Sequence, residues 1–198
     1  MSVERLDRAF FARPTEVVAE ALVGCRLLRR TTDGLVGGVV VETEAYGGPE
    51  DLASHAALYP RSRATIMGSE PGTVYVYRSY GIHSCFNVIA KVGGGVGAVL
   101  IRAVEPTAGA ELMRLRRGAR ADTDLCRGPG RLCQAFAITT TEANMDVVVS
   151  DDLWFGAPEA PRVVLRSTRI GITRAVDVPW RFFVEGSRFV SATQATSR

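Results

Sequence analysis

Lysine and histidine are scarce in this chain of 198 residues, which has one lysine, Lys91, and two histidines, His55 and His83. Its four cysteines are Cys25, Cys85, Cys126 and Cys133. No two of them have C-x-x-C spacing, and the histidines do not cluster. Zinc sites usually need such groupings, so we expect no metal site and interpret the cysteines as free structural residues.

A long hydrophobic run is also missing. No apolar stretch approaches the roughly 18 residues of a transmembrane helix, and no secretory leader follows Met1. The sequence therefore predicts a soluble protein that binds no membrane. We expect it inside the cell, in the cytoplasm and associated with the nucleoid if it is bacterial, with its thiols reduced.

The near-absence of lysine makes the basic residues almost entirely arginine, because Lys91 is the only lysine among 24 basic side chains. Arginine has a planar fork that suits phosphates and stacks on aromatic rings, which favours an anionic partner. The formal net charge is only +3. Biased composition with solvated arginines explains the count equally well, and both explanations stay open here.

The hydrophobic content of 46% suits one domain over residues 1–198, since a chain of this length can bury roughly 70% of its unfolded surface. The pattern predicts strands at 25–31, 35–46, 73–79, 82–91, 96–105, 162–172 and 180–191. It predicts helices at 13–24, 106–117 and 128–136. Thr15 is expected to cap the first helix and Pro106 to open the second, whose buried stripe would contain Leu112 and Leu115.

The stretch 39–55 concentrates chemical groups. Alternation along the strand sends Val40, Glu42, Glu44 and Tyr46 to one face. A break at residues 47–49 follows, and Pro49 would open a short helix carrying His55. Two carboxylates, a phenol and an imidazole therefore lie within about one strand and one turn, and any active site is expected here.

Glu42 and Glu44 have α-carbons about 6.8 Å apart on that face, a spacing typical of the paired carboxylates that hydrolyse sugar bonds. An ordinary polar strand face is the alternative. Arg102 interrupts an otherwise apolar strand face, and a buried guanidinium needs a carboxylate or a phosphate. Glu44 is its candidate partner.

Tyr80 is predicted at the tip of the hairpin formed by 73–79 and 82–91. A side chain inserted into DNA holds open the gap left by an extruded base, and Tyr80 could serve this role. It could instead fold back on Arg78 or His83. Asn87, among apolar neighbours, is either a structural amide or a group that reads hydrogen-bonding edges.

Two segments are candidates for phosphate contacts. Arg61 and Arg63 lie in the long irregular connection 47–71. Gly130 and Arg131 lie at a glycine-rich entry into the helix at 128–136, whose free amides could hold a phosphate although the lysine and hydroxyl of a P-loop are missing.

Taken together, these motifs resemble the alkyladenine (3-methyladenine) DNA glycosylase family from about Pro14 to Ser191. The matching motifs are Val41-Glu42-Thr43-Glu44-Ala45-Tyr46, Glu50-Asp51-Leu52-Ala53-Ser54-His55, Tyr75-Val76-Tyr77 with Tyr80-Gly81, Cys85-Phe86-Asn87, Leu100-Ile101-Arg102-Ala103, Gly128-Pro129-Gly130-Arg131-Leu132-Cys133-Gln134-Ala135 and Pro179-Trp180-Arg181-Phe182. Each motif is weak alone, but their order and spacing are specific.

The resemblance implies a monomeric, cofactor-free hydrolase of base excision repair that flips damaged purines out of duplex DNA and cleaves the N-glycosidic bond. Its partner would be double-stranded DNA with alkylated or deaminated purines. Glu44 matches the base that activates water and Arg102 an active-site arginine. Tyr46, His55 and Tyr77 match the residues that sandwich the flipped base. Glu42 has no such role in the family.

Two further roles follow from the family. Tyr80 matches the side chain that fills the vacated gap, and the bulk of Asn87 would oppose the exocyclic amino group of guanine. If Tyr77 and Asn87 both face the pocket, a two-residue turn fails because it pairs Tyr77 with Ser84. We therefore predict a three-residue loop or a bulge that aligns Tyr77 with Cys85.

Some positions depart from the family pattern. Ala64 follows Arg63 where the family usually has asparagine, Gly68 follows Met67 where an aromatic residue is usual, and Arg188 replaces a proline. The first two lie beside the expected pocket, so they bear on lesion range.

The sequence thus predicts a single-domain α+β protein with a curved, mainly antiparallel β-sheet surrounded by helices and a protruding β-hairpin. The predicted function is a DNA glycosylase for alkylated purines. A lesion-recognition protein that binds damaged DNA without cleaving it is the alternative.

Overall fold

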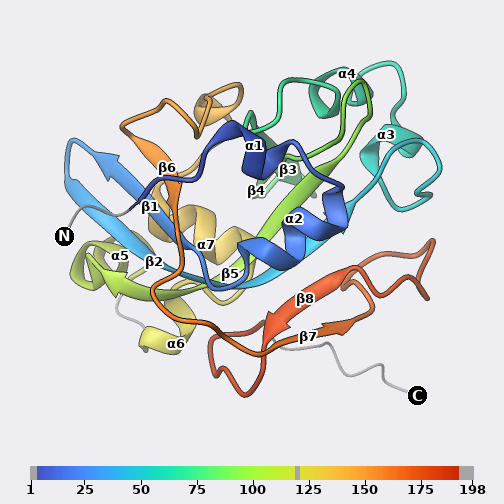
Figure 1. Cartoon of the computed structure of the whole chain (residues 1–198). Coiled ribbons are helices and arrows are strands. Elements are labelled where there is room, and N and C mark those ends of the chain that lie inside the picture. Colours follow the sequence, from blue (N-terminus) through green and yellow to red (C-terminus); the bar gives the residue numbers. More distant parts are fainter. Residues whose placement is uncertain (1–3, 119–120, 192–198) are drawn as a thin grey trace.

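One curved antiparallel sheet organises the computed structural model, which describes residues 4–118 and 121–191 (Figure 1). Its strands are β1 Arg26–Thr31, β2 Gly34–Tyr46, β3 Val74–Ser79, β4 His83–Ile89, β5 Ala98–Ala108, β6 Leu153–Gly156, β7 Val164–Ser167 and β8 Arg181–Val184. The main order is β3-β4-β5-β2-β1-β6, with β8 also paired to β2 and β7 to β8. The predicted α+β class with a curved antiparallel sheet is confirmed.

Short helices surround this sheet. They are α1 Arg8–Phe11, α2 Thr15–Leu22, α3 His55–Leu58, α4 Ala64–Met67, α5 Ala110–Arg117, α6 Asp122–Leu125, α7 Pro129–Phe136 and the 3₁₀ helix η1 Thr140–Glu142. In Figure 1, α2 lies in front of the sheet and α7 behind it. Both contribute to the main core, whose largest fully buried rings include Phe11, Phe86, Phe136 and Phe155. No described helix has the length and apolar character needed to cross a lipid bilayer.

Strand β2 is the central element. It pairs with β5 along one edge, while β1 and then β8 share the other edge. The β2–β5 register shifts at Gly38 and again between Val40 and Thr43. A Cβ on Gly38 would lie 2.3 Å from the Glu105 carbonyl oxygen, so only glycine fits this close approach.

The second irregularity corrects the predicted faces of β2. Val40 was expected on the same face as Glu42, with Val41 on the opposite face, but Val40 and Val41 both belong to the apolar core. A bulge places two successive residues of one strand against one residue of its neighbour and so resets the alternation. Beyond it, Glu42 and Glu44 share one face, as predicted, and Thr43 between them faces α2, where its hydroxyl donates to the Ala19 carbonyl.

Several predicted boundaries are wrong. Thr15 does not cap α2, because its hydroxyl donates to the Ala90 carbonyl. The helix carrying His55 begins after Ser54, whose side chain caps it, and not at Pro49. β5 continues through Pro106 to Ala108, so α5 begins four residues later than predicted.

This later start of α5 shifts its buried stripe. Met113 is buried, whereas Leu115 is 81% exposed. The closing strands are also shorter than predicted, since 162–172 contains only β7 and 180–191 only β8.

The four cysteines are buried and free, as predicted. Burial raises the pKa of Cys25 and of Cys126 to about 12 and also raises the pKa of Cys85 and of Cys133. Their thiols therefore stay protonated at neutral pH and behave as small apolar groups.

Candidate active site

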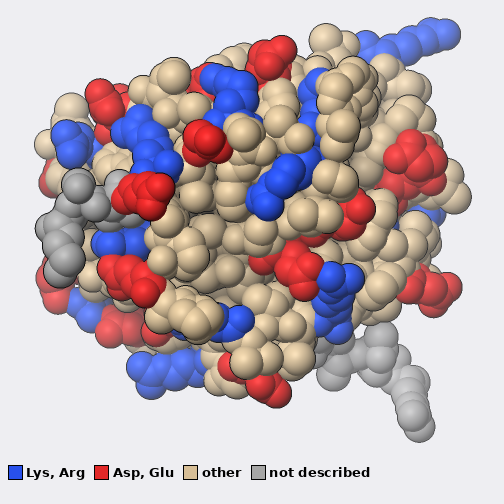
Figure 2. Space-filling model, in the orientation of Figure 1, with Lys and Arg blue, Asp and Glu red and all other residues tan. Residues whose placement is uncertain are grey.

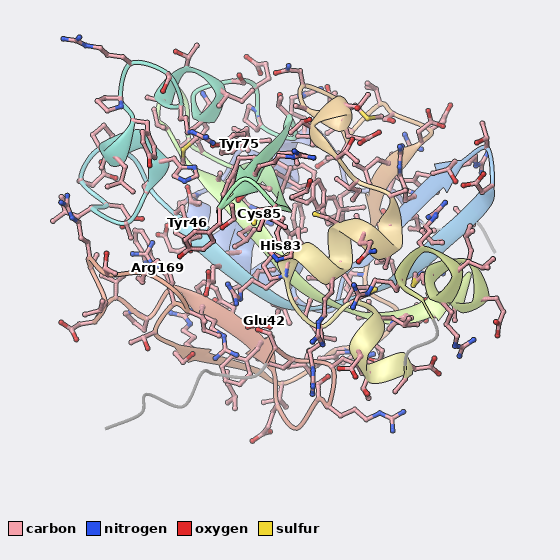
Figure 3. All side chains as sticks on the ribbon, turned by 180° about the vertical axis from the view of Figure 1, so that it is seen from behind. Glu42, Tyr46, Tyr75, His83, Cys85 and Arg169 are labelled. Carbon is pink, nitrogen blue, oxygen red and sulfur yellow. The ribbon has the colours of Figure 1, made fainter. Side chains whose placement is uncertain are left out.

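A cavity of about 790 Å³ lies beside the carboxyl end of β2. Its walls come from β2 to β5, the connection 47–71, the start of α7 and the segment 170–174. Figure 3, which views the molecule from the α7 side, shows Tyr46, Tyr75 and Cys85 gathered there. Seven predicted site residues line the cavity: Tyr46, His55, Arg63, Tyr77, Tyr80, Asn87 and Arg102.

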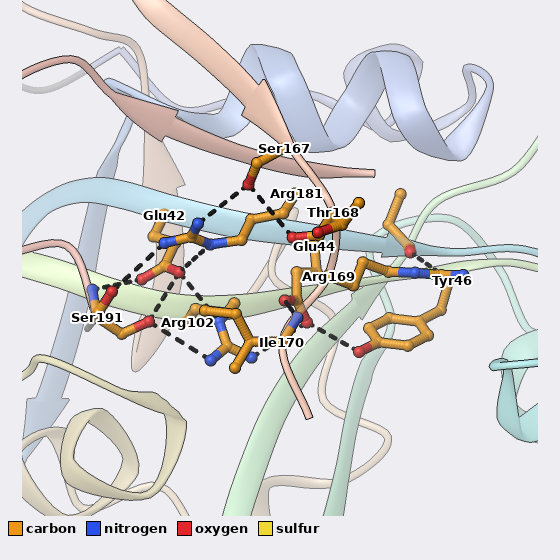
Figure 4. Close-up of polar contacts among 11 residues, drawn as sticks. Glu42, Glu44, Tyr46, Arg102, Ser167, Thr168, Arg169, Ile170, Arg181 and Ser191 are labelled. Carbon is orange, nitrogen blue, oxygen red and sulfur yellow. Dashed lines mark hydrogen bonds and ion pairs between the residues drawn. The ribbon is translucent and has the colours of Figure 1, made fainter. Parts of the chain in front are cut away.

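Glu44 lies directly behind this wall, and its side chain is fully buried. Its Oε2 accepts hydrogen bonds from the Tyr46 hydroxyl at 2.8 Å and from Arg102 at 3.1 Å, and its Oε1 accepts from the Ile170 amide at 2.7 Å (Figure 4). The predicted pairing of Arg102 with Glu44 is confirmed. Arg102 also pairs with Glu42.

These contacts define the protonation states. Burial raises the pKa of Glu44 above its ordinary value, and the Arg102 guanidinium opposes that rise. Burial and the Glu44 carboxylate raise the pKa of Tyr46 well above that of free tyrosine, so its phenol remains a donor. Burial lowers the pKa of Arg102, but Glu44 and Glu42 outweigh it, and the net shift is upward. Glu44 is thus a basic carboxylate beside two fixed donors.

The Tyr46 ring is supported from outside the cavity. The Arg169 guanidinium lies 4.9 Å from its centroid and 5.4 Å from that of Trp180. Arg169 is itself held by a bidentate ion pair with Asp51 at 2.6 and 2.8 Å. Although burial raises the pKa of Asp51, its hydrogen bonds from Arg169 and from backbone amides lower it overall, so this support is ionised at neutral pH.

His55 belongs to a chain of polar contacts on the other side of the cavity. Arg63 donates to the Tyr75 hydroxyl at 2.8 Å, and the same hydroxyl lies 2.8 Å from His55 Nδ1. Because arginine can only donate, the Tyr75 proton is free to bond His55 Nδ1. Burial, with a smaller effect of Arg63, lowers the pKa of His55 to about 4. The ring is therefore neutral at neutral pH.

The ring contacts show where a planar ligand fits. His55 and Tyr77 meet edge to face with centroids 4.4 Å apart, which leaves no room for a base between them. A base sandwiched by the predicted residues must therefore lie between Tyr46 on one side and the His55–Tyr77 pair on the other.

Asn87 is buried on β4, and its amide is fixed in one orientation. Its NH₂ group donates to the backbone carbonyls of Tyr75 and Cys85, both at 3.1 Å. Two acceptors require the nitrogen at that position, so the amide oxygen is the group left over. It accepts no hydrogen bond within residues 4–118 and 121–191, and Asn87 lines the cavity. The structural role of the Asn87 amide nitrogen is confirmed, and its role as a reader of hydrogen-bonding edges stays a prediction.

The β3–β4 hairpin has the predicted three-residue loop. Tyr77 pairs with Cys85 and Ser79 with His83, which leaves Tyr80, Gly81 and Ile82 in the loop. Tyr80 has φ of +51° and is 92% exposed, so it does not fold back on Arg78 or His83. The start of α7 packs against the hairpin, since a Cβ on Gly130 would come within 3.0 Å of His83.

The predicted phosphate contacts have different surroundings. Arg61 is exposed, whereas Arg63 lies in the cavity wall against the rings of Tyr59 and Tyr77. Arg131 is exposed and pairs with Asp124 at 2.9 Å. None of Glu44, Arg61, Gly130 and Arg131 lines the cavity.

The departures from the family pattern have simple surroundings. Ala64 packs at the edge of a small apolar cluster around Met67, and Gly68 ends α4. Arg188 is exposed and lies over the Phe189 ring.

Some site residues were missed. Tyr75 shares the strand face of Tyr77 by alternation, a signal that was available in the sequence. Arg169 had no local signal, because its partner Asp51 lies 118 residues away. Arg78 and Arg174 line the cavity and form no ion pair with the residues that the structure describes. Nor do those residues contain a group of three or more His, Cys, Asp or Glu side chains that could hold a metal ion.

Comparison with known proteins gives a consistent result. The sequence model of a family described as methylpurine-DNA glycosylase matches residues 9–188. A protein of Nitrobacter winogradskyi, named provisionally as a 3-methyladenine DNA glycosylase, is 46% identical over 94% of this chain and 86% of its own length. Proteins with the same name from Granulibacter bethesdensis and Agrobacterium fabrum are 47% and 46% identical, over 94% of this chain and 87% and 92% of their own lengths.

Proposed function

This chain belongs to the methylpurine-DNA glycosylase family, and from that premise we propose that it excises alkylated purines of the 3-methyladenine type from duplex DNA. It is a hydrolase of N-glycosidic bonds that initiates base excision repair, and it acts as a monomer inside the cell. The observation that carries the mechanism is the buried Glu44, hydrogen-bonded by Tyr46 and Arg102 at the wall of an aromatic cavity.

Glu44 activates the attacking water. From the residues that the structure describes, its Oε2 accepts two hydrogen bonds and its Oε1 accepts one, from Ile170. A carboxylate oxygen has about two acceptor sites, so Oε1 keeps one for water. Glu44 removes a proton as the water attacks C1′, and its charge favours the oxocarbenium-like transition state. The products are the free base and an abasic site.

The flipped base stacks between Tyr46 and the His55–Tyr77 pair. Stacking contributes on the order of 1 to 3 kcal/mol per ring and favours electron-poor alkylated purines. An alkylated base that is already cationic leaves readily, so a second carboxylic acid is less necessary. Glu42 is therefore not needed as an acid, which agrees with its ion pair with Arg102.

The hairpin keeps the base extruded. Tyr80 enters the duplex and fills the gap, while Arg78 and Arg174 at the cavity contact phosphates together with the exposed Arg61. Extrusion of a base requires such a replacement because unstacking costs a few kcal/mol.

A product assay tests this function. The purified protein is incubated with methylated duplex DNA, and both free bases and abasic sites are measured. We expect both products in equal amounts. Binding to methylated duplex with no released base would instead identify the protein as a lesion sensor.

A further inference from the structure

Glu42 makes more polar contacts than Glu44, although the proposed mechanism does not use it. Its Oε1 accepts from Arg181 Nε at 2.6 Å, from the Ser191 hydroxyl at 2.7 Å and from Arg102 Nε at 3.1 Å (Figure 4). Its Oε2 accepts from the Ser191 amide at 2.7 Å. The side chain is fully buried, so these contacts replace all of its hydration.

Arg102 is held from both ends of its guanidinium. Nε points to Glu42 and Nη1 to Glu44, both at 3.1 Å, and Nη2 lies 3.4 Å from the Ser191 hydroxyl. The group is planar, so fixing Nε also fixes the direction of Nη1. Glu42 and Ser191 therefore determine how Arg102 meets Glu44.

Charged and titratable groups face Glu44 from every neighbouring element. Glu42 and Tyr46 lie on β2, Tyr77 on β3, Cys85 on β4, Arg102 on β5, Arg169 on the segment after β7 and Arg181 on β8. Glu42 pairs with two of the guanidiniums and Glu44 with one. Without the charge of Glu42, Glu44 would be the only carboxylate of the pair facing Arg102.

We propose that Glu42, held by Ser191, is a positioning residue of the glycosylase reaction. It aligns Arg102 with Glu44 and takes up part of its positive charge, which keeps Glu44 basic enough to activate water. The inference rests on the proposed function. Ser191, the last residue that the structure describes, then helps to position the active-site groups.

The test is the pH–rate profile of Glu42→Gln, measured as single-turnover base release from methylated duplex. Glu42 is one of the groups that raise the pKa of Glu44, so removing its charge lowers that pKa. We expect the acid limb to move down by about one pH unit. The plateau rate should fall about tenfold, because a weaker base accepts the proton of water less well.

Glu142→Gln is the matched control. It breaks another buried glutamate–arginine pair, with Arg29 at 2.8 Å, without touching Arg102. Both variants should lower the melting temperature, but only Glu42→Gln should move the acid limb. Ser191→Ala keeps every charge and removes one hydroxyl donor, so the rate should fall about fivefold with unchanged affinity for methylated duplex.

A Glu42→Gln profile that keeps the wild-type acid limb and plateau would overturn the inference. If that variant does not fold, Ser191→Ala decides, and a wild-type rate overturns it. A wild-type protein that releases no base contradicts the proposed function instead, so the two failures are distinguishable.

Discussion

His55 illustrates how one side chain is tuned by its neighbours. The Tyr75 hydroxyl accepts from Arg63 and shares a hydrogen bond with His55 Nδ1, and partial burial disfavours the imidazolium. A lowered pKa means that the folded protein prefers the neutral ring. The stabilisation that comes from keeping His55 neutral is therefore complete above the ordinary histidine pKa of about 6.5 and is lost as the pH falls toward 4.

We predict that His55 titrates near pH 4 in an NMR experiment that follows the imidazole protons. His83→Gln leaves His55 as the only histidine and makes the assignment direct. A midpoint near 6.5 would show that the Arg63–Tyr75–His55 contacts do not hold the ring neutral.

Asn87 carries a second prediction at this scale. Asn87→Ser removes bulk from the cavity, so the ratio of 7-methylguanine to 3-methyladenine released from methylated DNA should rise several-fold, as measured by chromatography of the bases. Asn87→Leu keeps the bulk and should keep the wild-type ratio. A wild-type ratio in Asn87→Ser would rule out steric exclusion.

Prediction from sequence succeeded for contacts that are local or stereotyped. Glu44 and Arg102 were paired correctly because a buried arginine on an apolar face needs a carboxylate. The role of Glu42 could not be predicted, because Arg181 and Ser191 lie 139 and 149 residues further along the chain. Only the fold brings those donors together.

At the scale of elements, the β3–β4 hairpin was predictable because strand alternation and loop length are linked. Tyr77 and Asn87 can share one face of the hairpin only if the loop has an odd number of residues, and the structure has three loop residues. The positive φ of Tyr80 directs a large side chain into solvent at the tip.

Tyr80→Ala should weaken binding to lesion-containing duplex by about 1 to 3 kcal/mol and weaken binding to the same lesion in single-stranded DNA much less. Fluorescence anisotropy with both DNAs measures this difference. Leu115→Ala removes another strongly exposed apolar side chain, on α5, and should change neither affinity. Equal losses on the two DNAs would contradict insertion of Tyr80 into the duplex.

The segment 168–174 was not predictable. Its first five residues, 168–172, were expected in a strand over 162–172, but β7 ends at Ser167 and the chain then crosses over Glu44. The buried Arg169–Asp51 pair holds this segment against the connection 47–71, and the Ile170 amide donates to the Glu44 carboxylate. No local pattern reports an ion pair between distant segments.

At the scale of the whole molecule, the arginine-rich composition has a mixed explanation. Acidic and basic side chains are interspersed over the face that carries α2, around a largely uncharged centre (Figure 2). Many arginines are paired within the fold, such as Arg114 with Asp122 and Arg166 with Glu20. Of the arginines that line the cavity, Arg78 and Arg174 are the better candidates for contacts with DNA, because Arg63 donates to Tyr75 and Arg102 pairs with Glu42 and Glu44.

Arg78→Gln and Arg174→Gln should each reduce the slope of log affinity against log salt by about one, as expected for one lost phosphate contact. Binding to duplex measured over a range of salt concentrations checks this. Arg30→Gln removes an exposed arginine of β1 that does not line the cavity and should leave the slope unchanged. A flat salt dependence of the wild type would restore the composition-bias explanation.

The central claim is that Glu44 activates the water that cleaves the glycosidic bond. Single-turnover release of bases from methylated duplex by Glu44→Gln, with binding measured in parallel, tests it most directly. Glutamine preserves the size of the side chain but removes the base, so the rate should fall by about 10² to 10⁴-fold while affinity is retained. Release at the wild-type rate would contradict the account.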